Sequence, residues 1–166
     1  MSEIKIQIKN LYKIFGKNPK SALEQVKDGV NKDQLLEKHN HVLGLKDINL
    51  DIKEKSIQVV MGLSGSGKST LIRHINRLIE PTDGSVVVDG EDVLKMNDES
   101  LRNFRRTKTA MVFQRFALLP HKTVLENTMF GLHIQNIDEK EANTRARRWI
   151  DRVGLSGYEE KYPQHL

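Results

Sequence analysis

Apolar and polar residues alternate in two stretches of the first third of the chain. Every second residue is apolar in 4–8 and again in 48–52. A period of two is typical of a strand with one buried face, so we predict two such strands, the first at the outside of its sheet. Three valines at 86–88 predict a further short strand, and Asp89-Gly90 after it predicts a tight hairpin turn.

Two mainly apolar runs, 57–61 and 110–113, lack this alternation. Runs of this length with β-branched residues predict strands buried on both faces, as in a parallel sheet. The first run leads into a glycine-rich stretch, after which apolar residues recur at helical spacing as far as Ile79, and Pro81 ends that pattern. The order of strand, loop and helix therefore indicates an α/β core.

Residues 17–41 are polar and predict an inserted helical hairpin. Ser21 with Glu24 and Asn31 with Gln34 each place a cap residue three positions before Glu or Gln, which favours two helix starts. The apolar stripes of both helices are narrow. We therefore expect this hairpin to be peripheral to the domain.

Further caps predict three later helices. They are Asn97 or Asp98, Thr123 with Glu126, and Asp138 with Glu141. The last of these helices carries an apolar face and ends at a glycine; the residues are Ala142, Ala146, Trp149, Ile150, Val153 and Gly154.

Composition narrows the class of protein but does not identify it. The 166 residues are 37% hydrophobic and 30% charged, which favours one domain with one core. The chain has no cysteine, no apolar run long enough to span a bilayer and no signal-like start, so we expect a soluble or peripheral protein. The net charge of +5 is spread over several helices that also carry acidic residues, which favours solvated faces over a nucleic-acid surface.

The glycine-rich stretch carries the clearest chemistry. It fits glycine, four residues, then Gly-Lys-Ser, and consists of Gly62, Leu63, Ser64, Gly65, Ser66, Gly67, Lys68, Ser69 and Thr70. Glycines let the backbone N–H groups approach a polyphosphate at a helix start. Lys68 would reach the β- and γ-phosphates, Ser69 would supply a Mg²⁺ ligand and Thr70 would contact the α-phosphate side. The sequence predicts binding of a nucleoside triphosphate with Mg²⁺.

Other candidates have two interpretations each. Phe15 follows the first strand and is either at the edge of the core or a stacking platform for a base. For Tyr12 we expect a packing role, in the core or on the surface. Gln114, at the end of the apolar run, either contacts a metal or water or simply starts an exposed loop. His39 and His41 lack a third metal ligand nearby, which favours a turn exposed to solvent.

The order of motifs along the chain resembles the ATPase subunits of ABC transporters, and specifically those of glycine betaine/proline (quaternary amine) importers. The similarity covers essentially the whole chain. The segments that carry it are Met61–Thr70, Asn76–Thr82, Met111–Gln114, Phe116–Leu118, Pro120–His121 and Tyr162–Leu166, together with the insertion after Phe15-Gly16.

The resemblance implies a fold and a set of site residues. The fold is α/β, a P-loop NTPase core of ABC type with an antiparallel β subdomain and the start of an α-helical subdomain at about 115–166. Phe15 becomes the aromatic residue that stacks on adenine, and Lys68 with the loop amides becomes the clamp on the phosphates of ATP. Ser69 and Gln114 become Mg²⁺ ligands, with Gln114 also sensing the γ-phosphate.

The resemblance also implies partners. They are membrane permease subunits and a second copy of the ATPase subunit, at the cytoplasmic face of the cell membrane, with no nucleic acid. The coupled process is ATP-driven import of glycine betaine/proline-type osmolytes.

Two departures from the family pattern affect these expectations. Family members usually have glycine in the turn where this chain has Glu54-Lys55-Ser56, so we expect an altered turn. The signature motif and the catalytic glutamate of the family do not occur in 1–166. We therefore expect a partial nucleotide-binding domain, truncated before the signature motif and inactive alone. A soluble ABC-type ATPase acting on nucleic acid and a non-catalytic nucleotide-binding fragment are the alternatives.

Overall fold

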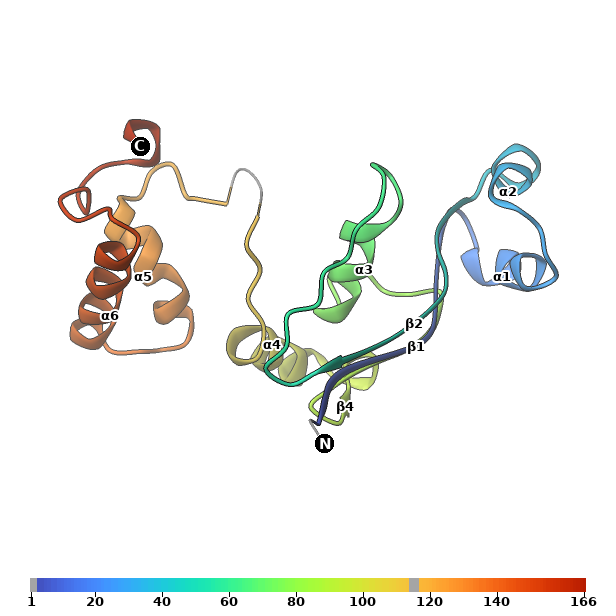
Figure 1. The fold of residues 1–166 in the computed structure, drawn as a ribbon, viewed down its shortest axis with the longest axis horizontal. Helices are drawn as coiled ribbons and strands as arrows, with labels where there is room; N and C mark the ends of the chain where they lie inside the picture. Colours follow the sequence, from blue (N-terminus) through green and yellow to red (C-terminus); the bar gives the residue numbers. More distant parts are fainter. Residues whose placement is uncertain (1–2, 114–116) are drawn as a thin grey trace. The chain divides into compact units, whose positions relative to one another are not determined.

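The computed structural model describes residues 3–113 and 117–166, and the chain divides into two compact units, 1–101 and 102–166 (Figure 1). Gln114 lies outside the described residues.

The first unit contains an antiparallel sheet with the strand order β2-β1-β3-β4. Its strands are β1 (Ile4–Phe15), β2 (Val42–Lys53), β3 (Asp83–Val88) and β4 (Glu91–Asp92). The strands predicted from alternation and from the valines are confirmed, and so is the turn at Asp89-Gly90, where both residues have positive φ. However, β1 pairs with β2 and with β3, so its predicted place at the outside of the sheet was wrong. Alternation shows which face is buried and not how many strands lie alongside.

Helices α1 (Pro19–Lys27) and α2 (Lys32–His39) lie between β1 and β2 in sequence and share a core with β1. The buried members of this core are Tyr12, Ile14, Ala22, Leu23, Val26 and Leu35. Tyr12 is thus a packing residue, as predicted. Leu23 and Val26 of α1 and Leu35 of α2 are buried in this core, whereas Leu36 of α2 is 48% exposed, so only part of the predicted apolar stripe of α2 is buried.

The caps of the two helices differ in how well the sequence predicted them. The capping box at Asn31 is confirmed, since the Gln34 amide donates to Asn31 Oδ1 at 2.8 Å. The start expected at Ser21 was wrong: α1 begins at Pro19 with Asn18 as its cap residue, and Ser21 Oγ donates to the Asn18 carbonyl at 2.8 Å. Proline is favoured in the first turn because its missing N–H has no intrahelical partner there.

His41 is buried and not in a solvated turn. Its Nδ1 lies 2.5 Å from the carbonyl oxygen of His39 and its Nε2 lies 2.6 Å from that of Lys17. Because Lys17 precedes α1 and His39 is the last residue of α2, His41 links the two ends of the helical hairpin.

The apolar runs 57–61 and 110–113 do not form strands, so both strand predictions were wrong. The side chains of Ile57 and Val112 are 94% and 98% exposed. A strand that is apolar on both faces needs neighbouring strands to pair its backbone and layers to cover its faces. Within the described residues, no strand pairs with either run.

Helix α3 (Lys68–Ile75) follows the glycine-rich loop and is shorter than predicted, because the helical pattern continues to Ile79 while the helix ends at Ile75. Its end is fixed by Arg77, which adopts positive φ and donates from Nε to Glu80 at 2.6 Å and from Nη1 to the Met96 carbonyl at 2.7 Å. The bond to Met96 attaches the end of α3 to the residue after the 3-10 turn η1 (Val93–Lys95).

Helix α4 (Asp98–Thr107) connects the two units in sequence. Its predicted cap is confirmed at Asn97, whose Oδ1 accepts from the Ser100 amide at 2.9 Å.

The second unit is built on α5 (Val124–Ile134) and α6 (Glu139–Arg152). Both predicted caps, at Thr123 and Asp138, are confirmed. The shared core consists of Val124, Leu125, Met129, Ala142, Ala146 and Ile150. Trp149 and Val153 were expected on the same face of α6 but are exposed, because they lie outside the narrow stripe that meets α5. The chain ends in the 3-10 turn η2 (Pro163–His165).

No helix in the described part of the chain has both the length and the apolar character needed to cross a membrane.

Candidate functional site

The loop 62–70 has the backbone that its glycines predict. Gly65 and Gly67 adopt φ of 76° and 91°, a region that is costly for residues with a side chain. Gly67 is the N-cap residue of α3, and no side chain caps this helix start. Because the first turn of a helix leaves its N–H groups without intrahelical partners, this turn presents donors and the positive end of the helix dipole.

The Lys68 side chain folds back over the loop. Its Nζ donates to the carbonyl oxygens of Gly62 and Leu63, each at 2.7 Å, and lies 3.4 Å from Ser66 Oγ. A further bond, from the Ser66 amide to the Leu63 carbonyl at 3.2 Å, closes the loop on itself. The ammonium group is therefore held in position at the helix start, where an anion would meet it.

The donors of this loop fit a magnesium-bound polyphosphate. Ser69 and residues 62–66 are exposed. The described residues contain no group of three or more His, Cys, Asp or Glu side chains that could hold a metal ion by themselves. Mg²⁺ in nucleotide sites is commonly held by few protein ligands together with substrate phosphates, so a serine hydroxyl at the helix start is a suitable ligand.

Phe15 ends β1 and pairs with Val42 of β2. Its side chain is 40% exposed, which leaves both interpretations from the sequence open. Lys13 Nζ lies 5.0 Å from the centre of the Phe15 ring and donates to the Glu80 carbonyl at 2.7 Å. Burial lowers the pKa of Lys13 from its usual value.

His74, one turn into α3 beyond the loop, is a supporting residue that the sequence did not indicate. It is completely buried, and its Nδ1 donates to the Thr70 carbonyl at 2.7 Å. Nε2 is buried and has no hydrogen-bond partner among the described residues. Burial lowers the pKa of His74, which agrees with a neutral ring. His74 lies three residues after Leu71 and so on the same helix face, but a histidine does not mark a buried face as an apolar residue does.

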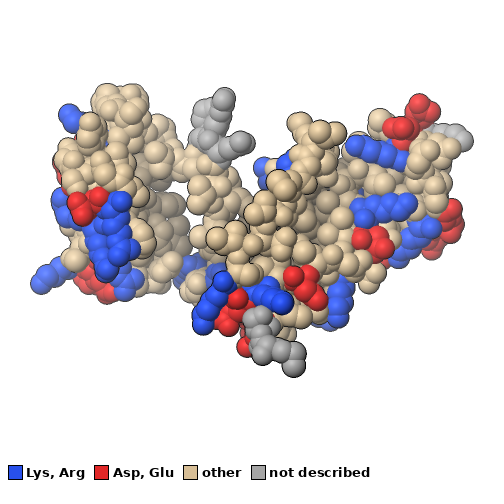
Figure 2. All heavy atoms as spheres, in the orientation of Figure 1, with Lys and Arg blue, Asp and Glu red and all other residues tan. Residues whose placement is uncertain are grey.

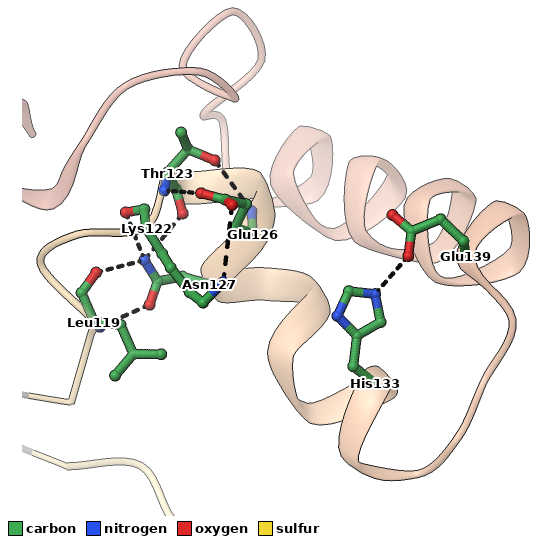
Figure 3. A network of polar contacts seen from close by, with 7 residues as sticks. All are labelled: Leu119, Lys122, Thr123, Glu126, Asn127, His133 and Glu139. Carbon is green, nitrogen blue, oxygen red and sulfur yellow. Dashed lines mark hydrogen bonds and ion pairs between the residues drawn. The ribbon is translucent and has the colours of Figure 1, made fainter.

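Asn127 has a similar supporting role in the second unit (Figure 3). Its Oδ1 accepts from the Leu119 amide at 2.8 Å, and its Nδ2 donates toward the carbonyl oxygens of Leu119, Lys122 and Thr123 at 2.9–3.1 Å. Beside it, Glu126 and Thr123 form the capping box of α5. Asn127 thus fixes the segment 119–123 on the helix, and no spacing rule predicts this.

Comparisons with known proteins agree on one family. A family model described as ABC transporter matches residues 45–166. The ATP-binding protein of the glycine betaine/proline betaine transport system of Escherichia coli (strain K12) is 52% identical over 163 residues, which are 98% of this chain and 41% of that protein. The glycine betaine transport ATP-binding protein of Bacillus subtilis (strain 168) is 44% identical over 98% of this chain and 39% of that protein.

A solved structure also matches. A dimeric ATP-binding cassette in a post-hydrolysis state, bound to ADP and Pi, is 29% identical with a TM-score of 0.77 over 97% of this chain and 62% of that chain. The chain spans about two fifths of the length of these curated relatives.

Proposed function

This chain belongs to the ABC transporter family and has the fold class that its sequence predicted, and from that premise we propose that it binds MgATP as part of an importer's energy-coupling ATPase subunit. The observation that carries the proposal is the placement of Lys68. Its ammonium group is held by the Gly62 and Leu63 carbonyls at the uncapped start of α3. This arrangement places a positive charge beside the first turn of α3, whose N–H groups have no side-chain cap, and that combination suits a polyphosphate.

The proposed roles follow from the chemistry of each residue. Lys68 and the amides of 62–70 bind the β- and γ-phosphates and stabilise the charge that develops on phosphoryl transfer. Ser69 and Gln114 hold Mg²⁺, which neutralises phosphate charge when bound. Phe15 stacks on the adenine base through its exposed ring.

The proposed transport role rests on the relatives. Two of them are named as ATP-binding proteins of glycine betaine or proline betaine transport. We propose the same class of cargo here, quaternary amines and proline-type osmolytes. The partners are membrane permease subunits and a second ATPase subunit, with the protein peripheral at the cytoplasmic face of the membrane.

The proposed domain organisation is one partial nucleotide-binding domain with a helical insertion at 17–41 and a helical region at 115–166 that meets the permease. Charge on this helical region is mixed: Arg145 pairs with Glu141, and Arg147 lies 3.9 Å from Glu159. Figure 2 shows acidic groups among the basic ones on the visible face of this unit. A mixed surface fits a protein partner better than nucleic acid, which requires a continuous basic face.

Titration calorimetry with MgATP tests the nucleotide-binding part of the proposal. Loss of one charge-assisted contact is worth about 1.5–3 kcal/mol, so Lys68→Ala should weaken binding by roughly 10- to 150-fold. Lys32→Ala removes the same charge from an exposed position in α2 and serves as the matched control. A dissociation constant that is the same in Lys68→Ala and Lys32→Ala would refute the assignment of the phosphate loop.

A further inference from the structure

Gly44 of β2 occupies a β-bulge beside the proposed site. Lys13 of β1 pairs with Leu45, and the next residue, Ile14, pairs with Leu43, so Gly44 is left without a partner on β1. A bulge of this kind re-aims the neighbouring chain, and glycine in a strand often marks close approach by another group.

On one side, Gly44 contacts Phe15. A Cβ atom at position 44 would lie 2.7 Å from Phe15 Cε2 and 3.3 Å from Cδ2. A carbon–carbon contact of 2.7 Å is far below the usual optimum near 3.5–4.0 Å, so the ring would have to move. The Lys13 carbonyl would lie 3.4 Å away, an ordinary contact, which leaves the Phe15 ring as the main obstacle.

On another side, the Gly44 carbonyl contacts the phosphate loop. A Cβ atom at Gly67 would lie 2.6 Å from the Gly44 oxygen and 3.0 Å from Leu45 Cδ2. The backbone of β2 and the last glycine of the loop are therefore in close approach. A single residue of β2 thus separates the Phe15 ring from the start of α3.

Resting on the proposed function, we infer that Gly44 is a positioning residue that sets the spacing between the base-stacking ring and the phosphate loop. The base and the phosphates of one nucleotide are covalently joined, so both contacts form together only when the ring and the loop are correctly spaced. A side chain at 44 displaces the ring, which disturbs the contact to the base and not the contacts to the phosphates. Gly44 therefore favours ATP over inorganic triphosphate.

The test measures the affinities of MgATP and of inorganic triphosphate with Mg²⁺ for the parent chain, Gly44→Ala, Phe15→Ala and the double variant. Base–aromatic stacking corresponds to about 5- to 150-fold in affinity. We expect Gly44→Ala to weaken MgATP by about fivefold or more and to leave triphosphate within about twofold. With the ring removed by Phe15→Ala, adding Gly44→Ala should change the MgATP affinity by less than about twofold, because no ring remains to be displaced.

Gly131→Ala in α5 is the matched control, since a Cβ atom there meets nothing within 4 Å, and it should change neither affinity. Equal losses for MgATP and triphosphate, or the same loss with and without Phe15, would overturn the inference. If Gly44→Ala does not fold, the double variant should fold and bind like Phe15→Ala, and a double variant that also fails to fold would overturn the inference as well. If the parent chain does not bind MgATP, both the proposed function and this inference are refuted. If the parent chain binds MgATP and Gly44→Ala has no effect, only this inference is refuted.

Discussion

Leu35 and Leu36 are neighbours in α2 with opposite environments. Substituting each in turn shows how much the helical insertion contributes to the stability of the core. Leu35 is 0% exposed and packs in the cluster that contains Tyr12 and Ile14, whereas Leu36 is 48% exposed. Truncating a buried leucine removes its transfer free energy and leaves a cavity, so Leu35→Ala should lower the free energy of unfolding by about 2–5 kcal/mol. Leu36→Ala should lower it by less than about 1 kcal/mol.

Urea unfolding followed by far-ultraviolet circular dichroism, with the thermal midpoint as a second readout, measures both variants. In a chain of this size about 1 kcal/mol corresponds to roughly 2–4 °C, so Leu35→Ala should lower the thermal midpoint by roughly 4–20 °C. Both substitutions change leucine to alanine at adjacent positions of one helix. The change in helix propensity is therefore the same in both variants, and the difference between them reports burial. A loss for Leu35→Ala as small as that for Leu36→Ala would show that the insertion is peripheral after all.

Two further predictions concern supporting residues. Burial lowers the pKa of His74, so the unfolded chain binds a proton at a higher pH than the folded chain. The contribution of His74 to stability is therefore fully present above about pH 6.5. It falls as the pH drops from that value toward the folded pKa. Urea midpoints at about pH 7.5 and about pH 5.5 should differ less in His74→Gln than in the parent, and an equal difference would contradict this role. Asn127→Ala should lower the free energy of unfolding by about 1–3 kcal/mol because backbone groups of 119–123 lose their partner; an unchanged urea midpoint would show that other contacts hold this segment.

Local signals in the sequence predicted local structure well. The capping boxes at Asn31 and Thr123 and the alternation in β1 and β2 depend on residues a few positions apart, and all are present in the structure. The glycine-rich loop 62–70 is equally local, because its glycines and Lys68 lie within seven residues. Its conformation agrees with the prediction, with Gly65 and Gly67 at positive φ.

Features that depend on distant partners were not predictable. The run 57–61 has a strand-like composition but no pairing strand among the described residues, and composition says nothing about partners. Gly44 gives no signal in the sequence, since its role depends on the bulge opposite Lys13 and on close approach to Gly67. His41 was expected in solvent but is buried. Its two carbonyl partners come from both ends of the insertion, and the sequence around His41 does not show that these ends meet.

Uptake of labelled glycine betaine into vesicles that contain the proposed membrane subunits and this protein tests directly whether nucleotide at the 62–70 loop drives transport. We predict uptake that requires ATP on the side of the ATPase subunit and that is lost in Lys68→Ala, while Lys32→Ala retains it. Uptake that continues without ATP, or that survives Lys68→Ala, would contradict the claim that nucleotide bound at the 62–70 loop energises transport.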